Sequence, residues 1–125
     1  MFKALSADAS PEATEHWWHQ RLTAGANLFL LLWFVVSLAL LGFQASPLDW
    51  STFTGWLAQP LAVILTLLLI GSTAYHFRLG LQVFTEDYVK GAGRAALLVA
   101  LNFFAVAIVV WAAFSILKVA FTAAA

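Results

Sequence analysis

The sequence predicts an all-α, integral membrane protein, a bundle of three transmembrane helices. Hydrophobic residues make up 63% of the 125 residues and charged residues only 10%, whereas soluble domains contain about 45–50% and about 25%. A soluble chain of this length could not bury so much apolar surface. Because the length suits one domain, we expect a single membrane domain over residues 1–125.

Three long stretches contain no charged residue: 22–48, 50–77 and 95–117. Each is longer than the roughly 20 apolar residues that a helix needs to cross a bilayer. In lipid, every backbone amide must be satisfied within its own segment, so these stretches are expected to be helices rather than strands. We predict that the helices cover about residues 22–43, 57–85 and 94–121.

The positions of lysine and arginine predict the orientation of the chain. Lys3 and Arg21 precede the first predicted helix, and Lys90 and Arg94 lie around the connection between the second and third. The connection between the first and second helices contains neither residue type. Since positive residues stay on the cytoplasmic side, we expect a multi-pass protein with its N-terminus in the cytoplasm.

Charge and cysteine content exclude several functions. The formal net charge is zero and no basic block is present, so nucleic-acid binding has no electrostatic basis. The chain has no cysteine, which excludes a disulfide, a thiolate zinc site and an iron–sulfur cluster held by this chain.

His76 is the only histidine within a predicted span, and a neutral imidazole is a common ligand of haem iron. Gly80 follows four residues later, about 40° around the helix, and Asp87 eleven residues later, about 20° around. A glycine at that place would let a flat macrocycle approach the backbone. The alternative is that His76 forms a hydrogen bond with a neighbouring helix.

Ionisable groups near the predicted cytoplasmic end also deserve a functional hypothesis, because such groups cost free energy in a membrane. Arg21 either anchors the first helix or binds an anionic or carbonyl oxygen. Arg78, about 200° around the helix from His76, either reaches the lipid headgroups or forms an ion pair with a partner or a haem propionate. We assign Arg78 no role.

Asp87 and Tyr88 end the second predicted helix. A carboxylate is disfavoured at a helix C-terminus, so Asp87 is expected to have a compensating cation, and Arg21 lies on the right side of the membrane to supply it. Tyr88 is either a residue of the interfacial aromatic belt or a hydrogen-bond donor to a ligand carbonyl. Glu86 and Lys90 are spaced to form a helical ion pair.

Two segments carry a resemblance to a known family. Residues 76–90 read HFRLGLQVFTEDYVK, and residues 16–24 read HWWHQRLTA. The first segment resembles the second-helix signature of the smaller membrane-anchor subunit of succinate dehydrogenase, respiratory complex II. The second resembles the start of the first helix in bacterial members. Length, three spans and an inside N-terminus also agree with this family.

The resemblance implies a fold, cofactors and partners. Two small anchor subunits would hold a flavoprotein subunit and an iron–sulfur subunit on the cytoplasmic face of a bacterial inner membrane. The pair would bind one haem b, with His76 as one axial ligand of the iron and the second anchor, a cytochrome b subunit, supplying the other. Tyr88 would hydrogen-bond ubiquinone, Asp87 would orient nearby groups, and Arg21 would lie near the quinone and the haem propionates.

Three other functions stay open at the level of sequence. The chain could be the anchor of a fumarate reductase, which runs the succinate/fumarate couple in reverse, and the sequence does not determine the direction. A haem-free structural scaffold would use His76 only to bond a neighbouring helix. A small transporter is disfavoured, because no span is broken at its middle by glycine or proline, and Gly71 alone is insufficient. In the complex that the resemblance implies, succinate oxidation is expected to occur on a partner, since no flavin fingerprint or dicarboxylate site is present in this sequence.

Overall fold

The computed structural model of the chain describes residues 11–124, and within them it contains helices and no strand. The helices are α2 (Pro11–Gln44), α3 (Trp50–Leu57), α4 (Pro60–Tyr88) and α5 (Ala92–Ala124). Three of them, α2, α4 and α5, are long and apolar enough to cross a membrane. The predicted all-α, three-span fold class is therefore confirmed. Lys3, which contributed to the predicted orientation, lies outside the described residues.

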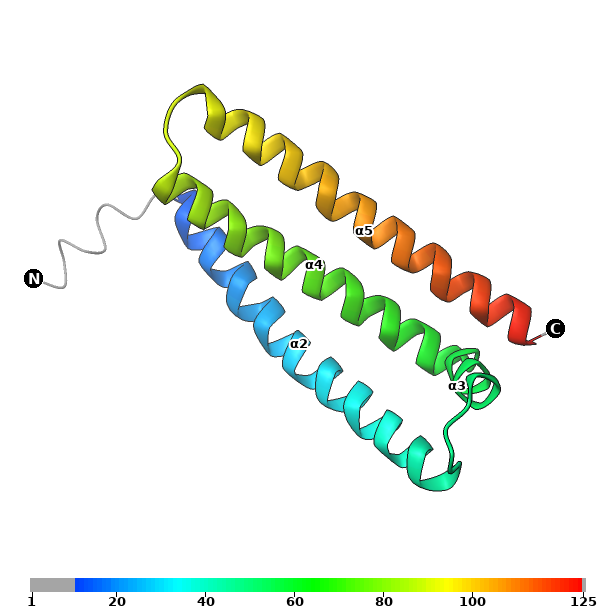
Figure 1. Cartoon of the computed structure of the whole chain (residues 1–125). Coiled ribbons are helices and arrows are strands. Elements are labelled where there is room, and N and C mark those ends of the chain that lie inside the picture. The colour runs from blue at the N-terminus through cyan, green and yellow to red at the C-terminus, as the bar shows by residue number, and fades with distance from the viewer. Residues whose placement is uncertain (1–10, 125) are drawn as a thin grey trace, which may run out of the picture.

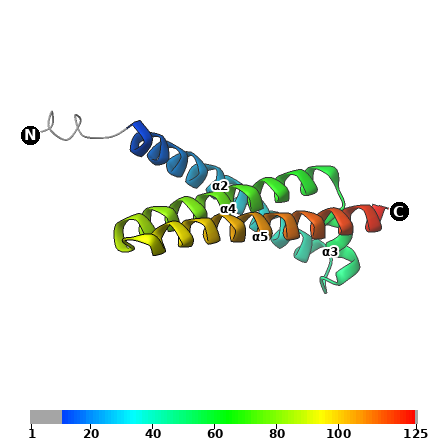
Figure 2. The same ribbon diagram turned by 90° about the horizontal axis from the view of Figure 1, so that it is seen from above.

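The central helix of the bundle is α4, which packs against α2 on one side and α5 on the other (Figure 1). The start of α2, the end of α4 and the start of α5 lie together at one end of the bundle (Figure 1). The short helix α3 lies at the opposite end, and α2 crosses the α4–α5 pair at an angle (Figure 2). Residues far apart in the sequence are thereby brought to the same end.

The long helices extend beyond most of the predicted limits. α2 begins at Pro11 rather than near residue 22, and α4 ends at Tyr88 rather than near residue 85. Hydropathy marks the part of a helix that lies in hydrocarbon, whereas backbone hydrogen bonding continues past the lipid boundary. α5 likewise covers Ala92–Ala124 instead of residues 94–121.

The second long helix begins at Pro60 rather than near residue 57, because a separate helix comes first. α3 ends at Leu57, and Gln59 has an extended backbone before Pro60 begins the next helix. Proline suits the first turn of a helix because its missing N–H would have no partner there. The backbone N–H of Thr52 donates to the Asp49 carboxylate at 2.8 Å, which caps the start of α3.

Little of the surface is buried within the chain. The buried hydrophobic residues within the described part are Leu57, Ala62, Leu79, Ile116 and Ala120. Large apolar side chains are exposed along every long helix, among them Phe29, Phe103 and Trp111. Exposed apolar surface on this scale is typical of helices that lie in lipid.

Candidate functional site

His76 lies on the side of α4 that faces α2. Its Nδ1 atom is 3.0 Å from Oγ1 of Thr23. The Thr23 hydroxyl also lies 2.8 Å from the backbone carbonyl of His19, to which it donates its single proton. We therefore assign the tautomer in which the Nδ1–H of His76 donates to Thr23 Oγ1. In this tautomer Nε2 keeps a lone pair, which is the form of imidazole that binds a metal.

Other polar contacts lie along the same seam between α2 and α4. The Tyr75 hydroxyl is 3.1 Å from Nδ1 of His19. The Thr73 hydroxyl donates to Oδ1 of Asn27 at 3.4 Å. Each such contact between membrane helices stabilises their association by about 0.6 kcal/mol on average. His76 thus has the bond to a neighbouring helix that the sequence left as an alternative, but the bond uses one ring nitrogen only.

Gly80 lies one turn beyond His76, beside α2. A Cβ atom added to Gly80 would lie 3.5 Å from Nε2 of Gln20, an ordinary van der Waals contact. The packing of this chain therefore does not require a glycine there. Gly80 and Gln20 also line a groove of about 480 Å³ at this end of the bundle, together with Trp17 and Glu86. His76 is not among the residues that line this groove.

The structure places Arg21, Asp87 and Tyr88 at the same end of the bundle without joining them. The guanidinium carbon of Arg21 lies 4.5 Å from the ring centroid of Trp17, one helical turn earlier. Tyr88 is 74% exposed and stacks on Phe84 with 4.7 Å between the ring centroids.

The expected ion pair between Arg21 and Asp87 is absent from the described part of the chain. An exposed ion pair gains little free energy and immobilises two side chains. The ring of Trp17 on the same helix offers Arg21 a cation–π contact instead.

The predicted pair of Glu86 and Lys90 is wrong. Because α4 ends at Tyr88, Lys90 lies in the connection that follows, where helical spacing does not apply. Glu86 instead accepts a hydrogen bond from Nε2 of Gln82 at 3.0 Å. It also lies 3.9 Å from a guanidinium nitrogen of Arg94 at the start of α5. Both side chains of this ion pair are partly exposed, so its contribution to stability is small.

Arg78 has a partner that the sequence analysis missed. Its Nε–H donates to Oδ1 of Asn102 on α5. Asn102 was recognisable as an amide within an apolar span, because such residues commonly bond across membrane helices. Since His76 bonds α2 and Arg78 bonds α5, the two side chains lie on opposite sides of α4. This arrangement agrees with the angle of about 200° that separates the two residues around the helix.

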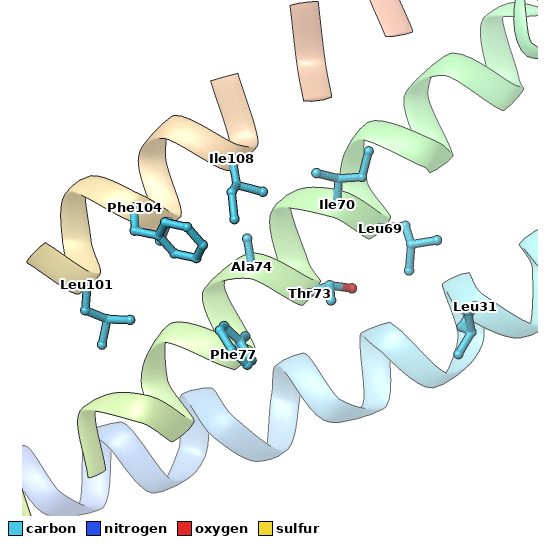
Figure 3. Close-up of a pocket in the computed structure, with 10 residues that line it drawn as sticks. Leu31, Leu69, Ile70, Thr73, Ala74, Phe77, Leu101, Phe104 and Ile108 are labelled. Atoms are coloured by element: carbon cyan, nitrogen blue, oxygen red, sulfur yellow. The ribbon is translucent and has the colours of Figure 1, made fainter. Parts of the chain in front are cut away.

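A second groove, of about 430 Å³, lies between the three long helices (Figure 3). Phe77 on α4 and Phe104 and Ile108 on α5 supply much of its apolar wall, and Leu31 lies on the α2 side. Thr73 is the one polar residue in the lining. With no titratable side chain, this groove offers space for apolar chains and no chemistry.

The donor set of the described residues fits half of a haem site rather than a separate metal centre. Residues 11–124 contain no group of three His, Cys, Asp or Glu side chains that could hold a metal ion. A bis-histidine haem shared by two chains needs one imidazole from each. His76, with Nδ1 engaged and Nε2 bearing a lone pair in the assigned tautomer, is suited to that role. Gly80 adds no side chain of its own one turn away, where the amide of Gln20 is the nearest group.

Comparison with known proteins covers most of the chain. The model of the succinate dehydrogenase/fumarate reductase transmembrane subunit family matches residues 2–116. The succinate dehydrogenase hydrophobic membrane anchor subunit of Rickettsia bellii (strain RML369-C) is 28% identical over 110 residues, which cover 86% of this chain and 84% of that protein. No solved structure matches at a significant level. The matches confirm the resemblance that residues 76–90 carried.

Proposed function

This chain belongs to the succinate dehydrogenase/fumarate reductase transmembrane subunit family, and on that premise we propose that it is the membrane anchor of a succinate:ubiquinone oxidoreductase. In the proposed complex it lies in a bacterial inner membrane with its N-terminus in the cytoplasm. It holds a flavoprotein subunit and an iron–sulfur subunit at the cytoplasmic face. The grouping of Arg21, Lys90 and Arg94 at one end of the bundle supports this orientation.

Succinate is oxidised on the partners in this proposal, because the 125 residues contain no flavin-binding fingerprint. A second anchor, a cytochrome b subunit, packs beside α2, α4 and α5. The support for this second anchor is the extent of exposed apolar surface, together with the presence of only one histidine, His76, within the charge-free stretches 22–48, 50–77 and 95–117.

His76 is proposed as one axial ligand of haem b, through Nε2. The haem, when bound, supplies a reversible one-electron carrier within the membrane. Thr23 accepts the Nδ1–H of His76, which orients the ring and raises its basicity toward iron. Gly80 leaves the surface beside the imidazole free of side-chain bulk. The bond between Thr23 and His76 is the observation on which this assignment depends.

Ubiquinone is proposed to bind near the cytoplasmic end of α4. Twelve residues separate His76 from Tyr88, about 18 Å along a helix, so the quinone headgroup would lie near water while the iron lies deeper. The Tyr88 hydroxyl donates a hydrogen bond to a quinone carbonyl, and Arg21 stabilises the negative charge that develops on that oxygen. Asp87 orients these groups. Water at the boundary supplies the two protons that reduction requires.

Two substitutions in the intact membrane complex test the two halves of the proposal. His76→Ala is expected to abolish the b-type band in a reduced-minus-oxidised spectrum, whereas Tyr88→Phe is expected to keep the band and lower quinone reductase activity. His19→Gln is a matched control, since it alters another imidazole of the same seam. A full b-type band in His76→Ala would refute the haem assignment, and unchanged quinone kinetics in Tyr88→Phe would remove Tyr88 from the mechanism.

One observation favours each of two alternatives. The matching family includes fumarate reductase subunits, so the complex could run in the opposite direction with a low-potential quinone. Identification of the quinone that co-purifies with the complex separates these directions. The hydrogen bond of His76 to Thr23 also suits a haem-free scaffold, which predicts no b-type band in the wild-type complex.

A further inference from the structure

A third groove lies at the end of the bundle opposite the start of α2. It has a volume of about 530 Å³ and runs between α3 and α5. Trp50, Trp111 and Phe114 form much of its apolar wall. Its polar residues are Thr54 on α3 and Ser115, Lys118 and Thr122 on α5. Neither the haem nor the quinone proposal uses this groove.

Lys118 has no counter-ion among residues 11–124. The one salt bridge of the described residues joins Arg94 and Glu86, at the other end of the bundle. Lys118 is the only lysine or arginine of residues 11–124 near the α3 end. The one acid near this end, Asp49, does not line the groove. Its carboxylate caps α3, which leaves the charge of Lys118 unmatched.

The groove spans the depth of a lipid headgroup and the first part of an acyl chain. Arg94 and Lys118 bracket the charge-free part of α5 and are about 36 Å apart along the helix. Lys118 therefore lies at headgroup level when Arg94 lies at the opposite boundary. Trp111 lies about 10 Å deeper, and the indole rings of Trp50 and Trp111 suit this interfacial region.

The hydrogen-bond donors in the groove that have no acceptor among residues 11–124 favour binding of an anion. The hydroxyl of Ser115 donates to the carbonyl of Trp111, and the hydroxyl of Thr54 donates to the carbonyl of Trp50. The ammonium of Lys118 and the hydroxyl of Thr122 remain as donors without an acceptor in the described residues. A phosphate oxygen satisfies both, whereas the cationic group of a zwitterionic lipid would be repelled by Lys118.

We propose that this groove binds an anionic phospholipid of the leaflet that the α3 end faces. The phosphate accepts from Lys118 and Thr122, and one acyl chain lies along Trp111 and Phe114. Charge complementarity determines the lipid class, and the aromatic wall determines where the chain lies. The site depends on α5 crossing the membrane and not on haem or quinone.

Quenching of tryptophan fluorescence by brominated lipids tests the proposal in the intact complex, reconstituted in nanodiscs. Brominated phosphatidylglycerol is expected to quench more strongly than brominated phosphatidylcholine. An electrostatic contribution of about 1 kcal/mol for one lysine corresponds to an approximately fivefold preference. The preference should disappear in Lys118→Gln and persist in the matched control Lys90→Gln, whose side chain lies at the other end. The measured preference should also become smaller in Trp111→Phe, because this variant removes one of the fluorescent indoles in the groove.

Four results would overturn the proposal: equal quenching by the two lipids, a preference that survives in Lys118→Gln, its removal by inorganic phosphate alone, or no quenching by either lipid in the complex. The third result would indicate a site for free anions. The fourth would mean that another subunit covers the groove. Circular dichroism of Lys118→Gln confirms that loss of the preference is not loss of the fold.

Discussion

Thr23→Val removes the acceptor of the His76 Nδ1–H while keeping the shape of the side chain. The bond it removes is 3.0 Å long and joins α2 to α4. Hydrogen bonds between membrane helices contribute about 0.6 kcal/mol on average and at most about 1.7 kcal/mol. We therefore expect the chain to fold and the complex to assemble, with a measurable change at the haem.

The expected change is a higher midpoint potential. A bonded Nδ1–H makes the imidazole a stronger electron donor, which favours ferric iron, so loss of the bond favours the reduced state. For a one-electron couple, a tenfold change in the equilibrium constant corresponds to 59 mV. If the whole free energy of the hydrogen bond stabilised one oxidation state, the midpoint potential would shift by about 25 mV for an average bond and at most by about 75 mV. Partial loss of haem is a second expected effect, since the ring of His76 is no longer held in one orientation.

Redox titration of the b-type band in the purified complex measures this shift. Thr23→Ser is the matched control, because it keeps the hydroxyl and should leave the potential near that of the wild type. An unchanged or lower potential in Thr23→Val, with normal haem content, would refute the assigned tautomer and the positioning role of Thr23.

Three further predictions concern other parts of the chain. Gly80→Ala places a Cβ 3.5 Å from Nε2 of Gln20, so assembly should be normal while haem content falls; full haem content would show that nothing lies against Gly80. Asn102→Leu removes the acceptor of Arg78 and should lower the free energy of unfolding by up to about 1.7 kcal/mol. Adding Arg78→Leu should restore the stability, because no guanidinium is then left without its acceptor; a double variant as unstable as Asn102→Leu would contradict this explanation. Hydrogen bonds from Thr52 and Ser51 lower the pKa of the Asp49 carboxyl, so its stabilisation of α3 should be complete above about pH 4 and lost as pH falls through that lowered pKa. Tryptophan fluorescence should follow this transition in the wild type and not in Asp49→Asn; a transition that persists in the variant would assign it to another group.

The sequence predicted which faces of α4 His76 and Arg78 occupy, but not the residues to which they bond. The angle of about 200° between His76 and Arg78 agrees with their bonding to different helices, α2 and α5. Although Asn102 was recognisable as a residue that bonds across helices, neither it nor Thr23 could be assigned to a particular partner, because helical spacing determines the face of a residue and not what lies opposite. The predicted pair of Arg21 and Asp87 does not form because Arg21 lies against the ring of Trp17. The predicted pair of Glu86 and Lys90 does not form because α4 ends before Lys90.

Hydropathy and composition alone determined that the chain is a three-span helical membrane protein. The reason is that hydrocarbon offers a backbone amide no partner, so a long apolar stretch has few alternatives to a helix. Only the tertiary structure decided that α3 forms a separate helix at one end and that α4 lies between α2 and α5. It also decided which nitrogen of His76 is engaged, because that depends on how the helices are rotated and packed, which residue spacing along one helix does not specify.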